Sequence, residues 1–258
     1  MAALEPLNGH VLLVEDNPVN QAVALGLLEE LGCEAVVAIN GQEAVERFTE
    51  EKFDVVLMDC EMPVMDGFEA TNAIRSQPGG ASDIPIIALT ANVVEGDRER
   101  CIESGMQDYL SKPISVENLH GTLKRWLPPG RNGSNSVSHT ALDSSSLDSI
   151  RNLKGIGGDK MVRRVVKLYL SNSSMLLEDL RLAIGLVDAE AERQSAHALK
   201  SSSVNVGACG LADVCKEIEA MGRSGDLGLV NDRLAQLEDL YPKTIDALKF
   251  AIDTASDC

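Results

Sequence analysis

The feature that most constrains the fold is an alternation between short apolar runs and amphipathic segments, repeated five times over residues 1–126. The apolar runs are "HVLLVED", "CEAVVAI", "FDVVLMD", "IPIIALT" and "QDYLSKP". The amphipathic segments that follow them are "VNQAVALGLLEELG", "GQEAVERFTEE", "GFEATNAIRSQ", "EGDRERCIESG" and "SVENLHGTLKRWL". Continuous apolar runs are typical of strands buried on both faces. The pattern therefore predicts an α/β domain over 1–126, with a doubly wound, five-stranded parallel sheet.

The rest of the chain has a different character. The stretch "LPPGRNGSNSVSHTALDSSS" is rich in Pro, Gly, Ser and Asn, which predicts a flexible linker over 127–146. From 147 to 258 five amphipathic runs follow one another with short breaks, and a short helix at "LDSIRNLKG" precedes them. We expect an all-α domain of the four-helix-bundle type there. Pro242 lies inside the last run and is expected to kink or interrupt that helix.

Charge and cysteine usage narrow the function. The formal net charge is −17. Residues 1–126 hold 8 Lys/Arg against 22 Asp/Glu, whereas residues 127–258 hold 15 against 18. This acidity argues against nucleic acid as a ligand. The six cysteines form no C-x-x-C pair, which favours free thiols in the cytoplasm. No apolar run reaches the ~18 residues that a membrane span needs, so we expect no direct membrane contact.

Acidic side chains follow two strands of the predicted sheet. Glu15 and Asp16 end the first apolar run, and Asp59 ends the third. Because parallel strands end at one edge of a sheet, the three carboxylates should converge there. Their mutual repulsion calls for a cation, and oxygen ligands of this kind suit Mg²⁺. Thr90 and Lys112 end the fourth and fifth runs, so a hydroxyl and an ammonium group join a site suited to a phosphoryl group.

The motifs "VLLVEDN", "DVVLMDCEMPVMDGFEA", "PIIALTAN" and "DYLSKPI" resemble the receiver domain of response regulators and hybrid sensor kinases. That resemblance covers about residues 9–126 and implies a flavodoxin-like fold with Asp59 as the phospho-acceptor. It further implies a Mg²⁺ site whose ligands are Glu15, Asp16, Asp59 and the backbone carbonyl of Glu61. Lys112, with a cis bond to Pro113, is implied to bind the phosphoryl group. Thr90 and Tyr109 are implied to be the switch pair that responds to phosphorylation. Cys60 is interpreted as a filler of the turn.

A histidine in the second domain carries the other half of the prediction. On a helix, His197 shares its face with polar residues, among them Lys200 and Ser201. The opposite stripe, Ala196, Leu199, Ser203 and Val206, is small or apolar and should pack. His197 is therefore expected to point to solvent or to a partner.

The stretch "HALKSSSVNVGA" resembles the histidine phosphotransfer (HPt) motif H-x-x-K-G-S-S. The sequence departs from that motif at Ser201, where the usual glycine is replaced. The resemblance implies that His197 carries a phosphoryl group, and a neutral imidazole can attack an aspartyl phosphate. Lys200 would stabilise the charge of the group during transfer.

Together the two resemblances imply a phosphorelay module, as in the C-terminal part of a hybrid sensor histidine kinase. Its partners would be the dimerisation and phosphotransfer domain of an upstream kinase and the receiver of a downstream response regulator, and the two domains of the chain could also dock on each other. The sequence contains no Gly-rich ATP-binding motif, so the chain is not expected to use ATP itself.

Alternatives stay open at this point. The chain could be a free-standing protein of this layout. It could be a docking module that phosphorylation switches while His197 stays idle. An aspartyl-phosphate hydrolase is disfavoured, because the second acid that such enzymes need would be Glu61, in the wrong geometry.

Overall fold

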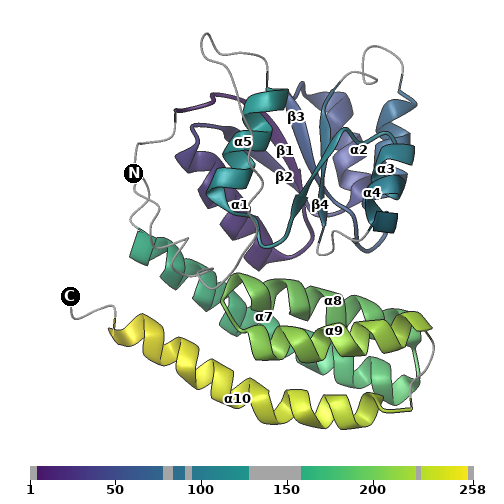
Figure 1. The fold of residues 1–258 in the computed structure, drawn as a ribbon, viewed down its shortest axis with the longest axis vertical. Coiled ribbons are helices and arrows are strands. Elements are labelled where there is room, and N and C mark those ends of the chain that lie inside the picture. The colour runs from purple at the N-terminus through teal and green to yellow at the C-terminus, as the bar shows by residue number, and fades with distance from the viewer. Residues whose placement is uncertain (1–4, 78–83, 91–94, 128–157, 225–227, 255–258) are drawn as a thin grey trace. The chain divides into compact units, whose positions relative to one another are not determined.

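The computed structural model describes residues 5–77, 84–90, 95–127, 158–224 and 228–254, which form two compact units. We call them the sheet unit and the bundle unit (Figure 1). The predicted linker over 127–146, apart from Leu127, and the short helix predicted at "LDSIRNLKG" lie outside the described residues.

The sheet unit contains five parallel strands in the order β2-β1-β3-β4-β5. The strands are β1 (His10–Val14), β2 (Glu34–Ala38), β3 (Val55–Asp59), β4 (Ile86–Thr90) and β5 (Asp108–Ser111). Val11, Leu12 and Leu13 in β1 are fully buried, as are Val55 to Leu57 in β3. The predicted five-stranded parallel sheet is therefore confirmed.

Five helices connect and follow the strands. They are α1 (Pro18–Glu30), α2 (Gly41–Glu50), α3 (Gly67–Arg75), α4 (Glu95–Glu103) and α5 (Val116–Trp126). Helices α1 and α5 cover one face of the sheet, and α2, α3 and α4 cover the other (Figure 1). Local sequence fixes several starts: Asn40 caps α2, Ser115 caps α5, and Asp66 caps α3 in a capping box with Glu69.

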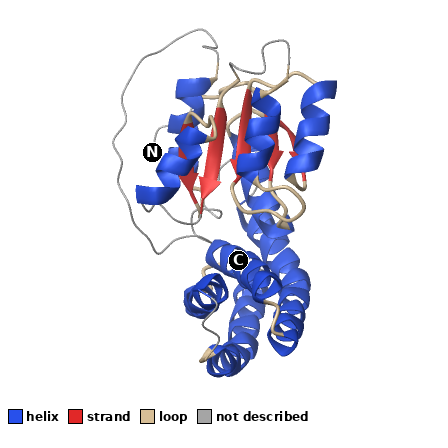
Figure 2. Cartoon of the chain, turned by 90° about the vertical axis from the view of Figure 1, so that its right-hand side faces the viewer, coloured by secondary structure: helices blue, strands red, loops and turns tan. Residues whose placement is uncertain are grey.

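The bundle unit consists, over the residues described, of four helices: α7 (Gly158–Leu186), α8 (Ala189–Asn205), α9 (Cys209–Ser224) and α10 (Val230–Thr254). These long helices are seen at another angle in Figure 2. The core-facing stripe predicted for α8 is confirmed, since Ala196, Leu199 and Ser203 are fully buried and Val206 is 2% exposed. Buried Tyr169 of α7 packs on this stripe, with its hydroxyl 2.9 Å from that of Ser203.

The structure departs from the expected helix boundaries of the bundle unit at two places. The first two predicted runs form the single helix α7. The polar segment between them stays helical because it packs in the unit, where the hydroxyl of buried Ser173 lies 2.9 Å from that of Tyr241 in α10. Helix α10 also continues through Pro242 without interruption. Buried Leu237 and Leu248 anchor it on both sides of the proline, which offsets a helix penalty of about 3 kcal/mol.

The cysteines fit the sequence-based prediction. Cys33, Cys60, Cys101, Cys209 and Cys215, the five that the structure describes, are all free thiols. Among the described helices, none combines the length and the apolar character that crossing a membrane requires.

A close backbone approach makes Gly67 a sensitive position. A Cβ atom at residue 67 would lie 2.1 Å from the backbone oxygen of Asp59, whereas one at Gly121 in α5 would meet nothing within 4 Å. We expect Gly67→Ala to lower the free energy of unfolding of the sheet unit by about 1–3 kcal/mol. The matched control Gly121→Ala should raise it by up to about 1 kcal/mol.

Urea denaturation followed by tryptophan fluorescence measures this effect. Trp126 is the only tryptophan of the chain, and its indole N–H donates a hydrogen bond of 2.8 Å to Asp108 of β5. It therefore reports on the sheet unit. Equal unfolding midpoints for the two alanine variants would contradict the packing described at Gly67.

Candidate functional site

The strand ends of the sheet unit bring the predicted residues together. Asp59 is the last residue of β3 and pairs in register with Leu89 of β4. Glu15 follows β1, where its backbone N–H donates to Ala38 at 3.0 Å. Lys112 follows β5, and its backbone N–H donates to the carbonyl of Thr90 at 2.7 Å. Backbone pairing of all five strands thus fixes where these side chains start.

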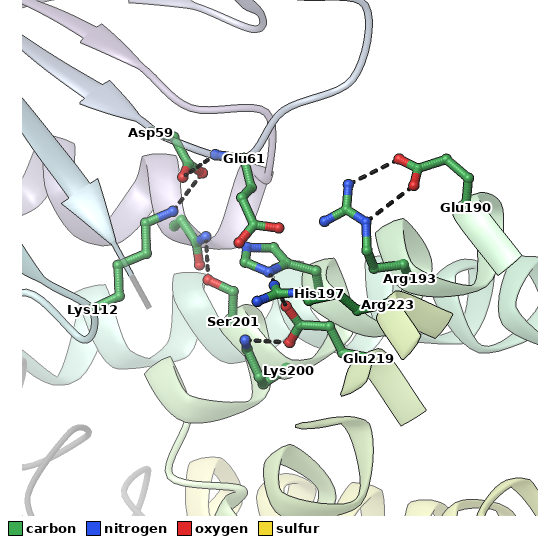
Figure 3. Close-up of polar contacts among 11 residues, drawn as sticks. Asp59, Glu61, Lys112, Glu190, Arg193, His197, Lys200, Ser201, Glu219 and Arg223 are labelled. Carbon is green, nitrogen blue, oxygen red and sulfur yellow. Dashed lines mark hydrogen bonds and ion pairs between the residues drawn. The ribbon is translucent and has the colours of Figure 1, made fainter. Parts of the chain in front are cut away.

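Lys112 joins two buried carboxylates. Its Nζ lies 2.5 Å from Asp59 Oδ2 and 2.6 Å from Glu15 Oε2 (Figure 3 shows the contact with Asp59). Burial alone would lower the pKa of the Lys112 ammonium. The negative charges and hydrogen bonds of Asp59 and Glu15 outweigh burial, so the pKa of Lys112 lies above its ordinary value. Lys112 is therefore a permanent cation beside Asp59.

The same edge has the donor set of a metal site. Oxygens of Glu15, Asp16 and Asp59 all lie within 4.8 Å of one another. Three hard oxygen donors at this spacing fit a divalent cation such as Mg²⁺, which takes one or two carboxylates and keeps water ligands. One lysine cannot neutralise three carboxylates, so the charge balance also favours a bound cation.

The remaining predicted residues of this unit lie around that edge. The backbone N–H of Glu61 donates to Asp59 Oδ1 at 3.3 Å, which places the Glu61 backbone beside the carboxylate. Thr90 ends β4, and partly buried Tyr109 of β5 packs against the apolar core. The bond between Lys112 and Pro113 is cis, as expected.

Cys60 is next to Asp59 in the chain, but its thiol is a weak nucleophile. The hydrogen bond between the Cys60 and Cys101 side chains and burial raise the pKa of the Cys60 thiol above its ordinary value. A thiol of high pKa inside a protein is a poor nucleophile. This agrees with the interpretation of Cys60 as a filler of the turn.

The predicted histidine of the bundle unit forms a second charged cluster. His197 and Lys200 are three residues apart on α8 and face α9, where both meet Glu219 (Figure 3). His197 Nδ1 lies 3.1 Å from Glu219 Oε1, and Lys200 Nζ lies 2.5 Å from Oε2. Arg223, one turn along α9, adds a contact of 3.3 Å to Oε1. The sequence predicts that His197 points to solvent or to a partner. That expectation is wrong for the Nδ1 side of the ring, which faces Glu219 of α9.

Glu219 determines which nitrogen of His197 is reactive. Burial would raise the pKa of Glu219, but His197 and Lys200 outweigh burial and lower it to about 2. An ionised carboxylate only accepts hydrogen bonds, so Nδ1 must carry a proton and donate it. In a neutral imidazole Nε2 is then the deprotonated nitrogen. The geometry thus leaves Nε2 as the ring nitrogen that carries the lone pair.

Glu219 is the member of this cluster that the sequence did not reveal. It is 22 residues from His197 and on another helix, and it looks like any other acid of an amphipathic run. A close helix approach brings it into place: a Cβ atom at Gly222 would lie 2.9 Å from the backbone oxygen of Ala189. Gly222 is the available sequence signal, since a helical glycine often marks close packing.

Comparison with protein families identifies both units. The model of the response regulator receiver domain matches residues 11–124, and the model of the Hpt domain matches residues 164–248. The chain belongs to both families. Its sheet unit is a receiver domain, and its bundle unit is an Hpt domain.

Similar proteins include sensor kinases. The chain is 32% identical to the sensor protein GacS of Pseudomonas syringae pv. syringae over 82% of its own length and 24% of the relative's. It is 30% identical to the signal transduction histidine-protein kinase BarA of Escherichia coli (strain K12) over 92% of its length and 26% of the relative's. The chain thus spans about a quarter of the length of these relatives.

A solved structure also matches the receiver domain. It is the receiver domain of the sensor histidine kinase PA1611 from Pseudomonas aeruginosa PAO1, whose active site cleft coordinates a magnesium ion. The identity is 46%, the match covers 46% of this chain and 97% of that chain, and the TM-score is 0.44.

The charge balance around Lys112 can be tested through stability. In Lys112→Met the carboxylates of Glu15 and Asp59 remain buried without their cation, which should destabilise the receiver domain by about 3–5 kcal/mol at pH 7. Millimolar Mg²⁺ should raise the urea midpoint of this variant more than that of the wild type. The midpoints are read from Trp126 fluorescence. An unchanged midpoint without Mg²⁺ would contradict the ion-pair geometry.

The low pKa of Glu219 predicts a pH dependence. A folded-state pKa of about 2, against an ordinary value of 4.5, stabilises the Hpt domain above pH 4.5. This contribution is lost as the pH falls from 4.5 towards 2. Glu219→Gln has no such titration, so its deficit in thermal midpoint relative to the wild type should shrink over that interval. Circular dichroism at several pH values measures the difference. A deficit that stays constant with pH would contradict the assignment.

Proposed function

We propose that the chain is a phosphorelay module. Asp59 takes a phosphoryl group from the histidine of a kinase and passes it to His197, which donates it to the receiver of a downstream response regulator. The observation that carries this proposal is that one chain holds both an Asp59–Lys112 cluster with metal-ligand geometry and an imidazole whose Nδ1 is bound by Glu219.

In the first step an Asp59 carboxylate oxygen attacks the phosphorus, and the bond from phosphorus to the donor nitrogen breaks. Lys112 supplies positive charge to the phosphoryl oxygens and holds the carboxylate in place. Glu15, Asp16, Asp59 and the Glu61 carbonyl would hold Mg²⁺, which would neutralise phosphoryl charge when bound. Thr90 and Tyr109 are proposed as the pair that responds to the modified Asp59.

In the second step His197 Nε2 attacks the phosphorus, and the bond to the Asp59 oxygen breaks to restore the carboxylate. Glu219 stabilises the positive charge that develops on the imidazole, since it accepts the Nδ1 proton's hydrogen bond. Lys200, held by the other oxygen of Glu219, provides positive charge on the same side of α8. Each step exchanges one phosphoryl bond for another, so the sequence can also run backwards.

The domain layout completes the proposal. We assign residues 1–126 to the receiver domain, 127–146 to a linker and 147–258 to the Hpt domain. As in the sequence-based prediction, the chain carries phosphoryl groups without using ATP, and its partners are a kinase and a response regulator.

Label chemistry tests the relay. Wild type, Asp59→Asn and His197→Gln would be incubated with ³²P-labelled acetyl phosphate and Mg²⁺. Phosphohistidine survives base and is lost in acid, whereas aspartyl phosphate is lost in base. We expect base-stable label in the wild type and in neither variant. Base-labile label alone, unaffected by His197→Gln even with candidate receivers present, would instead identify an Hpt domain that only docks.

Substitution of Glu219 tests the second step. Glu219→Ala removes both the acceptor for Nδ1 and the partner of Lys200. It should slow phosphoryl capture by His197 about 10–100-fold, as is typical when the partner that orients a metal-binding histidine is removed. Glu219→Gln retains an acceptor without the charge and should fall between Glu219→Ala and the wild type. Single-turnover transfer measures the rates. Identical rates in all three proteins would rule out the positioning role.

A further inference from the structure

The first half of α7 carries a set of three exposed cations along one face. Lys160, Arg164 and Lys167 are all exposed and recur at intervals of four and three residues, so they share one helix face. They span about 10 Å at ~1.5 Å per residue. We call these three residues the basic stripe.

The basic stripe has no anion of its own among the residues that the structure describes. None of its three members forms an ion pair or hydrogen bond there. Farther along the same helix, Arg181 shows the contrast, since it is bound by Glu178 at 2.9 Å and by Glu238 at 2.6 Å.

This arrangement is unfavourable for the helix itself. Like charges three or four residues apart repel each other by a few tenths of a kcal/mol per pair. Positive charge near a helix N-terminus also opposes the helix dipole, and Lys160 lies in the first turn of α7. Three like charges on one helix face, close to its N-terminus, therefore cost stability and bring the fold no benefit. We infer that this face binds an anionic partner.

The basic stripe is also separate from the chemistry of the Hpt domain. The contact between Tyr169 and Ser203 sets the register of α7 against α8. Arg164 lies five residues before Tyr169, and His197 lies six before Ser203. Because α7 and α8 are antiparallel, this places the stripe roughly 16 Å along the bundle from His197. It can therefore influence encounter but not the transfer of the phosphoryl group.

Charge complementarity identifies the partner. The receiver part of this chain, residues 1–126, holds 8 Lys/Arg against 22 Asp/Glu. A nucleic acid or an anionic membrane fits less well, because the Hpt part itself has a net negative charge, 15 Lys/Arg against 18 Asp/Glu.

We propose that the basic stripe is a steering surface of the Hpt domain that captures acidic receiver domains before phosphoryl transfer. The proposal rests on the function proposed above and adds a second surface to it. Steering of this kind raises the association rate and weakens with salt.

Two variants of the chain, each with both domains, give a transfer assay between separate molecules. The donor is His197→Gln, phosphorylated on Asp59, and the acceptor is Asp59→Asn, which keeps His197. The acceptor is compared with and without the pair Arg164→Glu and Lys167→Glu. We expect this pair to lower kcat/KM about 10-fold at low salt, to leave the rate at saturating acceptor unchanged, and to make no difference at ~0.5 M salt, where the screening length is only a few ångströms.

A matched charge reversal provides the control. The pair Lys243→Glu and Lys249→Glu changes the net charge of the acceptor equally through exposed residues of α10. Equal effects of the two pairs, or an effect that survives high salt, would overturn the steering proposal. The proposal would also be overturned if Arg164→Glu with Lys167→Glu abolished binding of the acceptor to a DNA duplex or to anionic phospholipid vesicles but left phosphoryl transfer unchanged. If the parent donor and acceptor exchange no phosphoryl group, the proposed function fails as well.

The same variant has a stability readout that excludes misfolding. Because the basic stripe is unfavourable for α7, Arg164→Glu with Lys167→Glu should leave the thermal midpoint of the Hpt domain equal or higher. A lower midpoint would overturn the argument that the stripe exists for a partner rather than for the fold.

Discussion

A carboxylate held by a lysine ammonium is the interaction on which each domain depends. In the receiver domain, Glu15 and Asp59 share Lys112 at 2.6 and 2.5 Å. In the Hpt domain, Glu219 is shared by Lys200 at 2.5 Å and by His197 at 3.1 Å. Removing one partner of a buried ion pair leaves an uncompensated charge, so the loss of a member from either cluster should destabilise its domain. Charge near the reacting atoms is thus set in advance, which lowers the reorganisation needed for phosphoryl transfer.

Close backbone approaches hold these clusters in place. Gly67 lets the start of α3 touch the backbone of Asp59, and Gly222 lets α9 approach the start of α8. Neither glycine carries chemistry, yet each determines where a reactive side chain lies. The two domains therefore use the same construction principle, in which small residues allow tight packing and the packing orients the ion pairs.

The receiver site could be predicted from sequence because strand order alone assembles it. Glu15, Asp59 and Lys112 each follow a short apolar run, and parallel strands end at one edge. Only the part of the Hpt site that lies on α8 could be predicted from the sequence. His197 and Lys200 are neighbours on one helix, but Glu219 depends on the rotation of α9 against α8, which local pattern does not encode. The helix break expected after Ser173 and the interruption expected at Pro242 are absent for a similar reason, since tertiary contacts outweigh local helix-breaking signals.

The two clusters together make one chemical claim: a phosphoryl group on Asp59 moves to Nε2 of His197, because Glu219 occupies Nδ1. Phosphorus NMR of the wild-type chain, labelled with ¹⁵N-histidine and supplied with acetyl phosphate and Mg²⁺, tests this claim directly. The account predicts an acyl phosphate signal followed by a phosphohistidine signal whose phosphorus couples to Nε2. A phosphohistidine bonded through Nδ1, or an acyl phosphate that decays with no phosphohistidine, would contradict it.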